Sequence, residues 1–391
     1  MRLSNCDLGV FFFHHHHALA TALVAIADRL APEPEDATHH DPSASLARAG
    51  RVARSMGADH GLYAYLLPSA IGDPPGPIDL RSVCLIREML GYVNPLADAI
   101  FAVQGLGTFP IVLAGTPHQR ARILPSALTG DSIGAFALTE PDAGSDVAAL
   151  ATTARREGDD YVLDGEKTFI SNAGIATHYV VFATVDAALG RRGITAFLVD
   201  HLAPGLQIKA IPLSGDHPLG TLQFTRCRVP ASALLGEVGG GFRLAMQTLD
   251  MYRVTVGAAA VGMARRALDE SVKRARERKQ FGKPIAENQT VQNYLAEMAT
   301  ELEASRLLVY RAAHLKDTGA SRISTEAAMA KMYATEAAQG IIDKAVQIFG
   351  GLGVVRGQVV ERLYRDIRPL RIYEGTTEIQ KLIIAKDLLS R

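Results

Sequence analysis

The chain has 391 residues, of which 48% are hydrophobic, so it is long enough for two or three packed domains with substantial cores. It carries 41 Lys and Arg against 41 Asp and Glu, a balance that gives no support for a broad basic surface facing nucleic acid or an anionic membrane. Its three cysteines, Cys6, Cys84 and Cys227, form neither a metal spacing nor a disulfide framework. We therefore expect no metal centre and a reducing, cytoplasmic location.

The N-terminal segment combines aromatic residues 11–13, histidines 14–17 and an apolar stretch that ends near Ala27. The four histidines interrupt the apolar run, and the rest is too short to span a bilayer. An amphipathic helix is therefore predicted in place of a signal peptide. Because consecutive residues on a helix point in different directions, residues 14–17 are not expected to bind a metal.

Up to about residue 130 the pattern is mostly helical. The clearest helix runs from about Asp79 through Leu90, and a second follows Pro95. Residues 31–36 and 68–77 are rich in Pro and Gly, which predicts loops.

A third helix in this zone has marked ends. Thr116 is a suitable N-cap, Pro117 fits the first helical position, Gln119 completes a capping box and Gly130 follows the last turn. Residues 1–130 are therefore assigned to an N-terminal α-helical domain.

Residues 131–236 change to strand patterns without long helices between them, which predicts an antiparallel β-barrel or sandwich. A hairpin is predicted over residues 161–169, with its turn at the Asp164-Gly165 pair. Further strands are expected over residues 178–185, 194–199, 206–211 and 221–225.

Residues 237–391 return to helical periodicity, which predicts a C-terminal four-helix bundle. The expected helices cover residues 241–279, 291–316, 324–349 and 378–389. The predicted fold class is therefore mostly α with a central β domain.

Four stretches could carry chemistry, and each also has an ordinary structural interpretation. Residues 136–146 end a strand in a Pro/Gly turn that carries hydroxyls, which suits an ordinary turn or the lip of a site for a flat heterocycle. Residues 167–174 contain Phe169, which fits either a sheet core or a ligand face. Residues 276–284 form a basic helix end, which fits a solvated surface or a pyrophosphate partner.

The fourth stretch places Glu374 directly before Gly375, on a loop rather than on a helix face. Thr376 or Thr377 caps the last helix, and Thr377 with Gln380 has the spacing of a capping box. A carboxylate on such a loop is usually solvated. In a closed apolar pocket, however, desolvation would raise its pKa and make it a usable base.

In their order and helix–sheet–helix setting, these four stretches resemble the acyl-CoA dehydrogenase family. The most specific matches are residues 139–146 (TEPDAGSD), 277–283 (ERKQFGK), 347–351 (QIFGG) and 373–376 (YEGT). The resemblance is strong from about Thr116 to the end of the chain and weaker before it.

The resemblance implies that Glu374 is the catalytic base and that FAD is the cofactor. It places Ser171 near the isoalloxazine N5 edge and Ser145 toward the thioester. The residues implied to contact FAD are Phe136, Leu138, Thr139, Ser145, Phe169, Ser171, Arg278, Gln280, Phe281, Gln289, Gln347, Gly350, Gly351, Thr376 and Glu378. Those implied to contact the substrate are Ser145, Asp250, Arg253 and Gly375.

The implied reaction is α,β-dehydrogenation of an acyl-CoA or acyl-carrier-protein thioester to the 2-enoyl thioester. The implied partners are an electron-transfer flavoprotein or a similar acceptor and further copies of the chain, in a homotetramer built as a dimer of dimers. Phe169 stands where the family often has Trp, and Tyr252 stands where one branch carries its base. Because a tyrosine cannot serve as that base, this departure strengthens the assignment of Glu374.

Two other functions stay open on this fold. An acyl-CoA oxidase or a flavin monooxygenase would pass electrons to oxygen, although the monooxygenase branches generally lack the base. A non-catalytic flavin-binding scaffold is the other alternative. The small residues 257–260 and Gly262 on the long helix fit either room for a longer acyl chain or close helix packing.

Overall fold

The computed structural model describes residues 1–32, 41–67 and 76–390, apart from the side chain of Pro42. Most of the two predicted loops, residues 31–36 and 68–77, lies outside the described residues. The chain divides into two compact units, one of Met1–Ala37, Asp79–Asp98 and Arg253–Arg391, the other of Thr38–Ile78 and Ala99–Tyr252. The three-domain division with boundaries near residues 130 and 236 stays a prediction.

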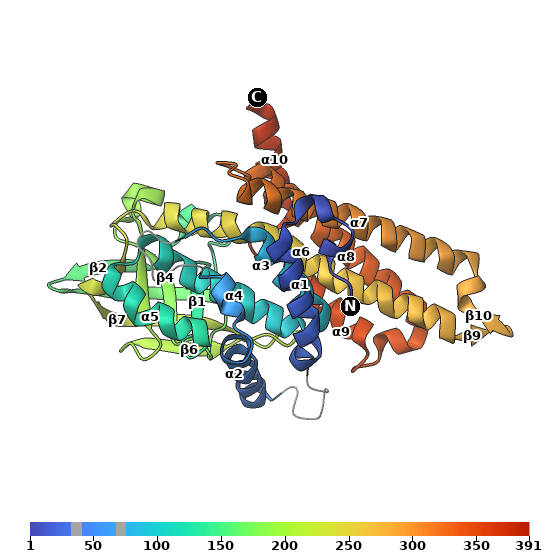
Figure 1. The fold of residues 1–391 in the computed structure, drawn as a ribbon. Coiled ribbons are helices and arrows are strands. Elements are labelled where there is room, and N and C mark those ends of the chain that lie inside the picture. Colours follow the sequence, from blue (N-terminus) through green and yellow to red (C-terminus); the bar gives the residue numbers. More distant parts are fainter. Residues whose placement is uncertain (33–40, 68–75, 391) are drawn as a thin grey trace. The chain divides into compact units, whose positions relative to one another are not determined.

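The first unit is helical (Figure 1), and α6, α7, α8 and α10 form where the four helices of the C-terminal bundle were predicted. Its helices are α1 (His14–Ile26), α3 (Leu80–Val93), the part of α6 (Gly241–Glu277) from Arg253 onward, α7 (Gln289–Asp317), α8 (Ser324–Phe349), α9 (Val359–Ile367) and α10 (Thr377–Leu389). A two-stranded hairpin, β9 (Lys279–Gln280) with β10 (Lys283–Pro284), joins α6 to α7. The mostly α fold class is confirmed.

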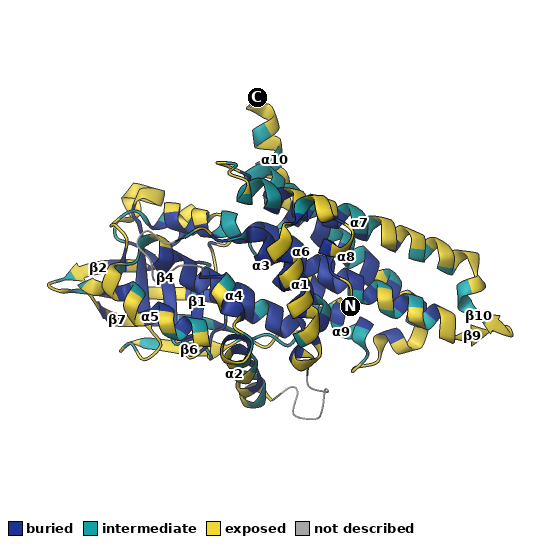
Figure 2. Cartoon of the chain, in the orientation of Figure 1, coloured by how far each residue is buried: buried dark blue, intermediate teal, exposed yellow. Residues whose placement is uncertain are grey.

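Small residues let the helices of this unit approach closely. A Cβ atom on Gly262 of α6 would lie 2.1 Å from the Glu88 carbonyl oxygen of α3, and one on Gly257 would lie 2.8 Å from Val309 of α7. Residues 258–260 are fully buried. The helix-packing interpretation of these small residues is therefore confirmed at both glycines. Figure 2 shows the resulting burial of α3, which is dark blue along most of its length.

The second unit contains α2 (Pro42–Ala58), the part of α4 (Pro95–Ala114) from Ala99 onward, and α5 (Pro117–Thr129). The capping prediction for α5 is confirmed, because Thr116 and Gln119 exchange their capping bonds and Gly130 has a φ of +77°. α4 is long and apolar enough to cross a membrane, but 89% of that window is buried inside the protein. Such burial is typical of a core helix.

The second unit also holds one eight-stranded sheet with the order β6–β7–β3–β2–β4–β5–β8, and β1 pairs with β4. Most pairs are antiparallel as predicted, but β1 and, at a single residue pair, β2 run parallel to β4. β4 is buried along its whole length, in keeping with strands that are covered on both faces. The strands are β1 (Gly134–Ala137), β2 (Thr153–Glu157), β3 (Asp160–Ser171), β4 (His178–Thr184), β5 (Ile194–Asp200), β6 (Leu206–Ala210), β7 (Leu219–Pro230) and β8 (Leu234–Leu235).

The predicted hairpin turn at Asp164-Gly165 is wrong. β3 runs straight through this pair, and the register with β7 shifts between Leu163 and Gly165. Gly165 forms an irregularity in the ladder, and its φ of +143° is one that other residues rarely adopt. The turn lies instead at Gly158, between β2 and β3.

Candidate active site

Glu374 lies on the short loop between the η10 turn (Arg368–Arg371) and α10. Its φ is +51°, which is uncommon for a residue with a side chain, and the following Gly375 has a φ of +91°. Backbone of this kind persists only where its surroundings hold it, and it gathers at functional sites.

Side chains from α8 and α10 hold this loop. Lys331 of α8 donates to the Gly375 carbonyl oxygen at 2.7 Å. Gln380 of α10 donates to the carbonyl oxygens of Gly375, at 2.8 Å, and Glu374, at 3.3 Å. Thr377 donates to Glu336 of α8 at 2.5 Å. Side chains from two helices therefore fix the backbone at Glu374 and Gly375.

These contacts correct one prediction. Thr376 caps α10 by accepting from the Ile379 amide at 3.4 Å, as one of the two alternatives predicted. The capping box of Thr377 and Gln380 does not form, because both side chains are used to hold the Glu374 loop.

Glu374 is partly buried, and one oxygen of its carboxylate is withdrawn from water. Its Oε2 atom is buried and accepts no hydrogen bond from any residue that the structure describes. Burial raises the pKa of Glu374, while the positive charges of Arg87, Lys331 and Arg253 oppose that rise. A carboxyl group with a raised pKa is a stronger base once it is ionised.

A buried ion pair belongs to the same surroundings. Arg87 of α3 donates to both carboxylate oxygens of Asp98, at 2.8 and 2.7 Å, and to Thr255 at 2.9 Å. Both charged side chains are buried. A guanidinium held in this way stays charged and adds a fixed positive potential near Glu374.

Arg87, Asp98, Lys331 and Gln380 were not predicted as residues of this site. They come from α3, α4, α8 and α10, between 6 and 287 residues from Glu374 in the chain. One signal was present: Arg87 and Glu88 are adjacent charges in a helix that is otherwise strongly apolar. Charges on a buried helix indicate internal partners.

In the second unit, the stretches around Thr139 and Phe169 lie side by side. The Thr168 amide donates to the Thr139 carbonyl oxygen at 2.9 Å. Lys167 donates to the Leu138 carbonyl oxygen at 3.1 Å and to Glu140 at 2.6 Å. The two predicted flavin-contacting stretches are thus joined by side-chain and backbone bonds.

Phe169 is turned out of this sheet. Its φ is +55°, the register of β3 with β7 shifts beside it, and 61% of its side chain is exposed. An aromatic face offered at a sheet end, next to hydroxyl groups, fits the isoalloxazine of FAD. The other predicted contacts differ: Leu138 is buried, Phe136 packs on Phe182, and Ser145 is exposed.

Ser171, the residue predicted beside N5, has a partner that was not predicted. His217 lies with Nε2 at 2.7 Å from the Ser171 hydroxyl oxygen. Burial lowers the pKa of His217 to about 4, with Asp216 opposing, so the ring is neutral near pH 7. Arg48 and Ser45 of α2 hold Asp216 and with it the loop that carries His217.

A third group of predicted FAD contacts lies elsewhere in the first unit. Arg274, one turn before Arg278, places its guanidinium carbon 5.7 Å from the centre of the Phe349 ring, so the ends of α6 and α8 lie together. Phe281 at the hairpin tip is fully exposed. Gln347 is 16 residues beyond Lys331 on α8, or roughly 24 Å at the helical rise. The structure therefore does not gather Arg278, Gln280, Phe281, Gln347, Gly350 and Gly351 around Glu374 of the same chain.

The remaining predicted residues have mixed positions. Arg253 is buried and contributes to the electrostatics of Glu374, whereas Asp250 is partly exposed. Gln289 opens α7, one residue after its cap Asn288, and Glu378 is exposed in the first turn of α10.

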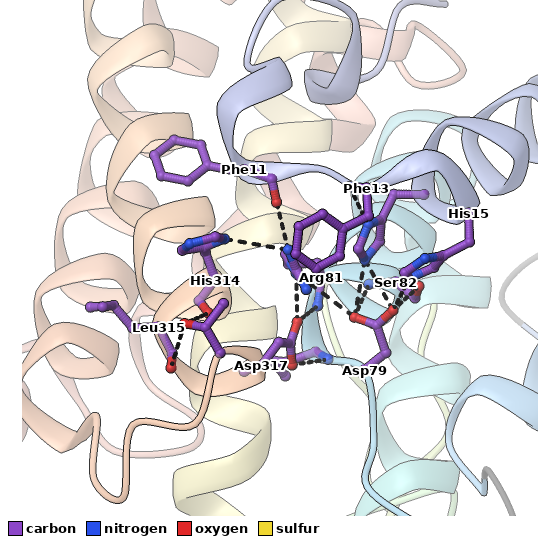
Figure 3. A network of polar contacts seen from close by, with 12 residues as sticks. Phe11, Phe13, His15, Asp79, Arg81, Ser82, His314, Leu315 and Asp317 are labelled. Carbon is purple, nitrogen blue, oxygen red and sulfur yellow. Dashed lines mark hydrogen bonds and ion pairs between the residues drawn. The ribbon is translucent and has the colours of Figure 1, made fainter.

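A separate polar cluster involves the histidine run (Figure 3). His15 and His16 both place Nε2 within 3.1 Å of the Asp79 carboxylate, although consecutive helical residues were expected to diverge. The three residues have the spacing of a metal site. However, the Phe13 amide donates to His16 Nδ1 at 2.9 Å, so His16 Nε2 carries the proton and donates to Asp79. This bond leaves His16 Nε2 without the lone pair that a metal ligand needs.

The same cluster continues to α7. Arg81 binds Asp317 at 2.8 Å, and its guanidinium also donates to the Phe11 carbonyl oxygen. Burial and the neighbouring Asp79 carboxylate raise the pKa of Asp317 to about 6. Figure 3 shows these side chains between α1, α3 and α7, where they connect three helices of the first unit.

Sequence models of all three acyl-CoA dehydrogenase domains match the chain: the N-terminal domain over residues 14–131, the middle domain over 135–227 and the C-terminal domain over 239–389. A 3-(aryl)acrylate reductase of Clostridium sporogenes is 42% identical over 85% of this chain and 88% of its own length. The human mitochondrial short-chain specific acyl-CoA dehydrogenase is 42% identical over 90% of this chain and 84% of its own length.

Solved structures agree. The glutaryl-coenzyme A dehydrogenase glutaryl-CoA complex aligns with a TM-score of 0.89 and 31% identity, covering 97% of this chain and 96% of the other. A prolyl acyl carrier protein oxidase aligns with a TM-score of 0.86 and 29% identity, covering 96% and 99%. The chain belongs to the acyl-CoA dehydrogenase family, whose members are FAD-dependent oxidoreductases.

Proposed function

We propose that the protein oxidises an acyl thioester to the 2-enoyl thioester, with Glu374 removing the α-proton. The observation that carries this proposal is the buried Oε2 of Glu374, which accepts no hydrogen bond from the described residues and lies on a left-handed loop. A carboxylate oxygen that is free of partners and shielded from water has the lone pair and the basicity that proton abstraction needs.

The chain's residues would divide the work as follows. Phe136, Leu138, Thr139, Ser145, Phe169 and Ser171 would hold the flavin ring, and Thr376 and Glu378 would add contacts from the start of α10. Ser145, Asp250, Arg253 and Gly375 would position the substrate. FAD, when bound, would accept the hydride from the β-carbon. The backbone N–H of Glu374 would polarise the thioester carbonyl and so acidify the α-proton.

The residues at the far end of α8 support an oligomer. Because Gln347 lies roughly 24 Å along α8 from Lys331, the group of Arg278, Gln280, Phe281, Gln289, Gln347, Gly350 and Gly351 would serve the FAD of a neighbouring copy. The Phe281 side chain is fully exposed, as a contact with the FAD of a neighbouring copy requires. This favours a homotetramer made of two dimers.

The electron acceptor would be an electron-transfer flavoprotein or a similar carrier, and the location would be cytoplasmic, as three free cysteines suggest. A second candidate is an oxidase, and the likeness to a prolyl acyl carrier protein oxidase favours it. The same likeness makes a carrier-protein thioester a candidate beside acyl-CoA. Because the chain is 42% identical to a 3-(aryl)acrylate reductase, the reduction of a 2-enoyl thioester should be assayed as well.

The test follows the visible absorbance of the purified flavoprotein under anaerobic conditions while short, medium, branched and aryl acyl-CoAs, and one acyl-carrier-protein thioester, are added. Wild-type flavin should bleach with at least one thioester. Glu374→Gln keeps the shape but loses the base, so its bleaching rate should fall by a factor of about 100 to 10,000.

The outcomes separate the candidates. Rapid reoxidation of the bleached flavin by air would identify the oxidase. Flavin that stays oxidised with every thioester, and whose reduced form is not reoxidised by any enoyl thioester, would leave the non-catalytic scaffold. Bleaching that is as fast in Glu374→Gln as in wild type would remove Glu374 from its assigned role.

A further inference from the structure

Lys331 is a fully buried lysine in the middle of the helical unit. Its side chain has 0% exposure, and its Nζ ends on the Gly375 carbonyl oxygen at 2.7 Å rather than on a carboxylate. A buried ammonium group is costly unless its charge is compensated. Burial accordingly lowers the pKa of Lys331 to about 8, although the negative charge of Glu374 opposes that shift.

The carbonyl that Lys331 binds belongs to the strained part of the base loop. Glu374 and Gly375 both have positive φ, a backbone conformation that is strained for a residue with a side chain. Gln380, which is also fully buried, binds the same carbonyl oxygen at 2.8 Å. Two donors from two helices therefore fix the peptide next to the proposed base, one of them charged and one neutral.

Lys331 also differs from the other cations around Glu374. Arg87 and Arg253 contribute to the same electrostatic field, but guanidinium groups do not lose their charge at physiological pH. Lys331 can lose its charge, and it binds the backbone of the base loop directly through the Gly375 carbonyl oxygen. The other charged groups that face Lys331 are Arg253, Glu336 and Glu378.

We propose that Lys331 is a positioning residue for the proposed reaction: it holds the loop that carries Glu374 and supplies positive charge that favours the ionised, proton-accepting form of the carboxylate. The inference rests on the proposed function. It assigns to one side chain both the geometry and part of the electrostatics of the base.

Two variants separate these roles. Lys331→Gln removes the charge but keeps an amide donor, whereas Gln380→Leu removes the second bond to Gly375 but keeps the charge. The acid limb of the pH profile for flavin reduction should move up by about one pH unit in Lys331→Gln. In Gln380→Leu the limb should stay in place while the maximal rate falls roughly tenfold, because the base is misplaced. Lys331→Arg should return the limb toward its wild-type position.

A measurement without turnover keeps this inference separate from the proposed function. Replacing Glu374 by Gln changes the free energy of unfolding by an amount that depends on pH. The folded-state pKa of Glu374 is raised. The Glu374 carboxylate therefore lowers the free energy of unfolding as the pH rises from about 4.5 through that pKa. The pH window of this difference should extend to higher pH in the Lys331→Gln background.

The charge role would be overturned if Lys331→Gln had the same acid limb of the pH profile as wild type and left the pH window of the Glu374→Gln stability difference unchanged. A maximal rate that is unchanged in Lys331→Met, which can neither donate nor carry charge, would overturn the holding role. If no thioester reduces the flavin but the stability window still moves, the proposed function fails while the coupling of Lys331 to Glu374 stands.

Discussion

Lys167 and Glu140 form a buried ion pair that joins the two flavin-facing stretches of the second unit. Their Nζ and Oε1 atoms are 2.6 Å apart, and Glu140 also accepts from the Ala151 and Thr152 amides. Burial raises the pKa of Glu140, but Lys167 and these amides outweigh it and lower the pKa overall. Glu140 therefore contributes stability above pH 4.5 that is lost as the pH falls through the lowered pKa.

Lys167→Met removes the ion-pair partner of Glu140 and should destabilise the protein. The unpaired carboxylate stays buried, so the free energy of unfolding should fall by about 3–5 kcal/mol at pH 7. The variant should regain part of this loss at pH 5, where wild type does not, because the unpaired Glu140 then takes up a proton. Urea unfolding at both pH values measures it. The double variant with Glu140→Gln is the control, and equal losses in single and double variants would contradict the argument.

At the scale of residues, the sequence located what lies on loops and missed what lies inside helices. Glu374 was singled out as a loop carboxylate before a glycine, and its role as the base is implied by the resemblance of residues 373–376 to the family's motif. The partners of Arg87 and Lys331 could not be predicted, because they are distant in the chain. Arg87 binds Thr255, 168 residues away, and Lys331 binds Gly375, 44 residues away. Only the tertiary fold shows that they surround one carboxylate.

At the scale of elements, α3 and α6 meet backbone to backbone. A Cβ on Gly262 would lie 2.1 Å from the Glu88 carbonyl oxygen and 2.8 Å from the Tyr92 amide nitrogen. Gly262→Ala must push the helices apart, and the free energy of unfolding should fall by about 1–3 kcal/mol or more. Gly340→Ala in α8 is the matched control, because a Cβ there meets nothing within 4 Å.

Gly340→Ala should instead raise the stability by about 0.4–1 kcal/mol, since alanine reduces the freedom of the unfolded chain. Thermal unfolding of both variants and of wild type measures the expected loss of stability in Gly262→Ala and the expected gain in Gly340→Ala. A Gly262→Ala protein as stable as wild type would mean that α3 and α6 can separate without loss.

Helix ends and strand runs were the predictable elements. α5 and α8 have the predicted limits, because caps and periodicity are local. The Asp164-Gly165 hairpin failed because Asp-Gly also suits a β-bulge. The choice between turn and bulge depends on β7, which pairs with β3 from about 60 residues further along the chain.

At the scale of the whole molecule, the C-terminal end of α10 and the β9–β10 hairpin are largely exposed (Figure 2). Leu382, Leu388, Leu389 and Phe281 are all more than half exposed. Three of these four residues belong to α10, and groups of exposed apolar side chains are typical of protein interfaces. With the distribution of the predicted FAD contacts along α8, they favour assembly of identical chains.

Sedimentation velocity should therefore show a species near four times the 41.9 kDa chain mass. Each leucine buried in an interface stabilises it by about 1.5–3 kcal/mol, and symmetry repeats the contact, so Leu388→Ser with Leu389→Ser should shift the protein toward smaller species at micromolar concentration. Leu202→Ser is the control, because that residue is 78% exposed on a turn after β5. If the wild type sediments as a monomer that still binds FAD tightly, the residues at the far end of α8 have no cofactor to serve, and the proposed assembly is wrong.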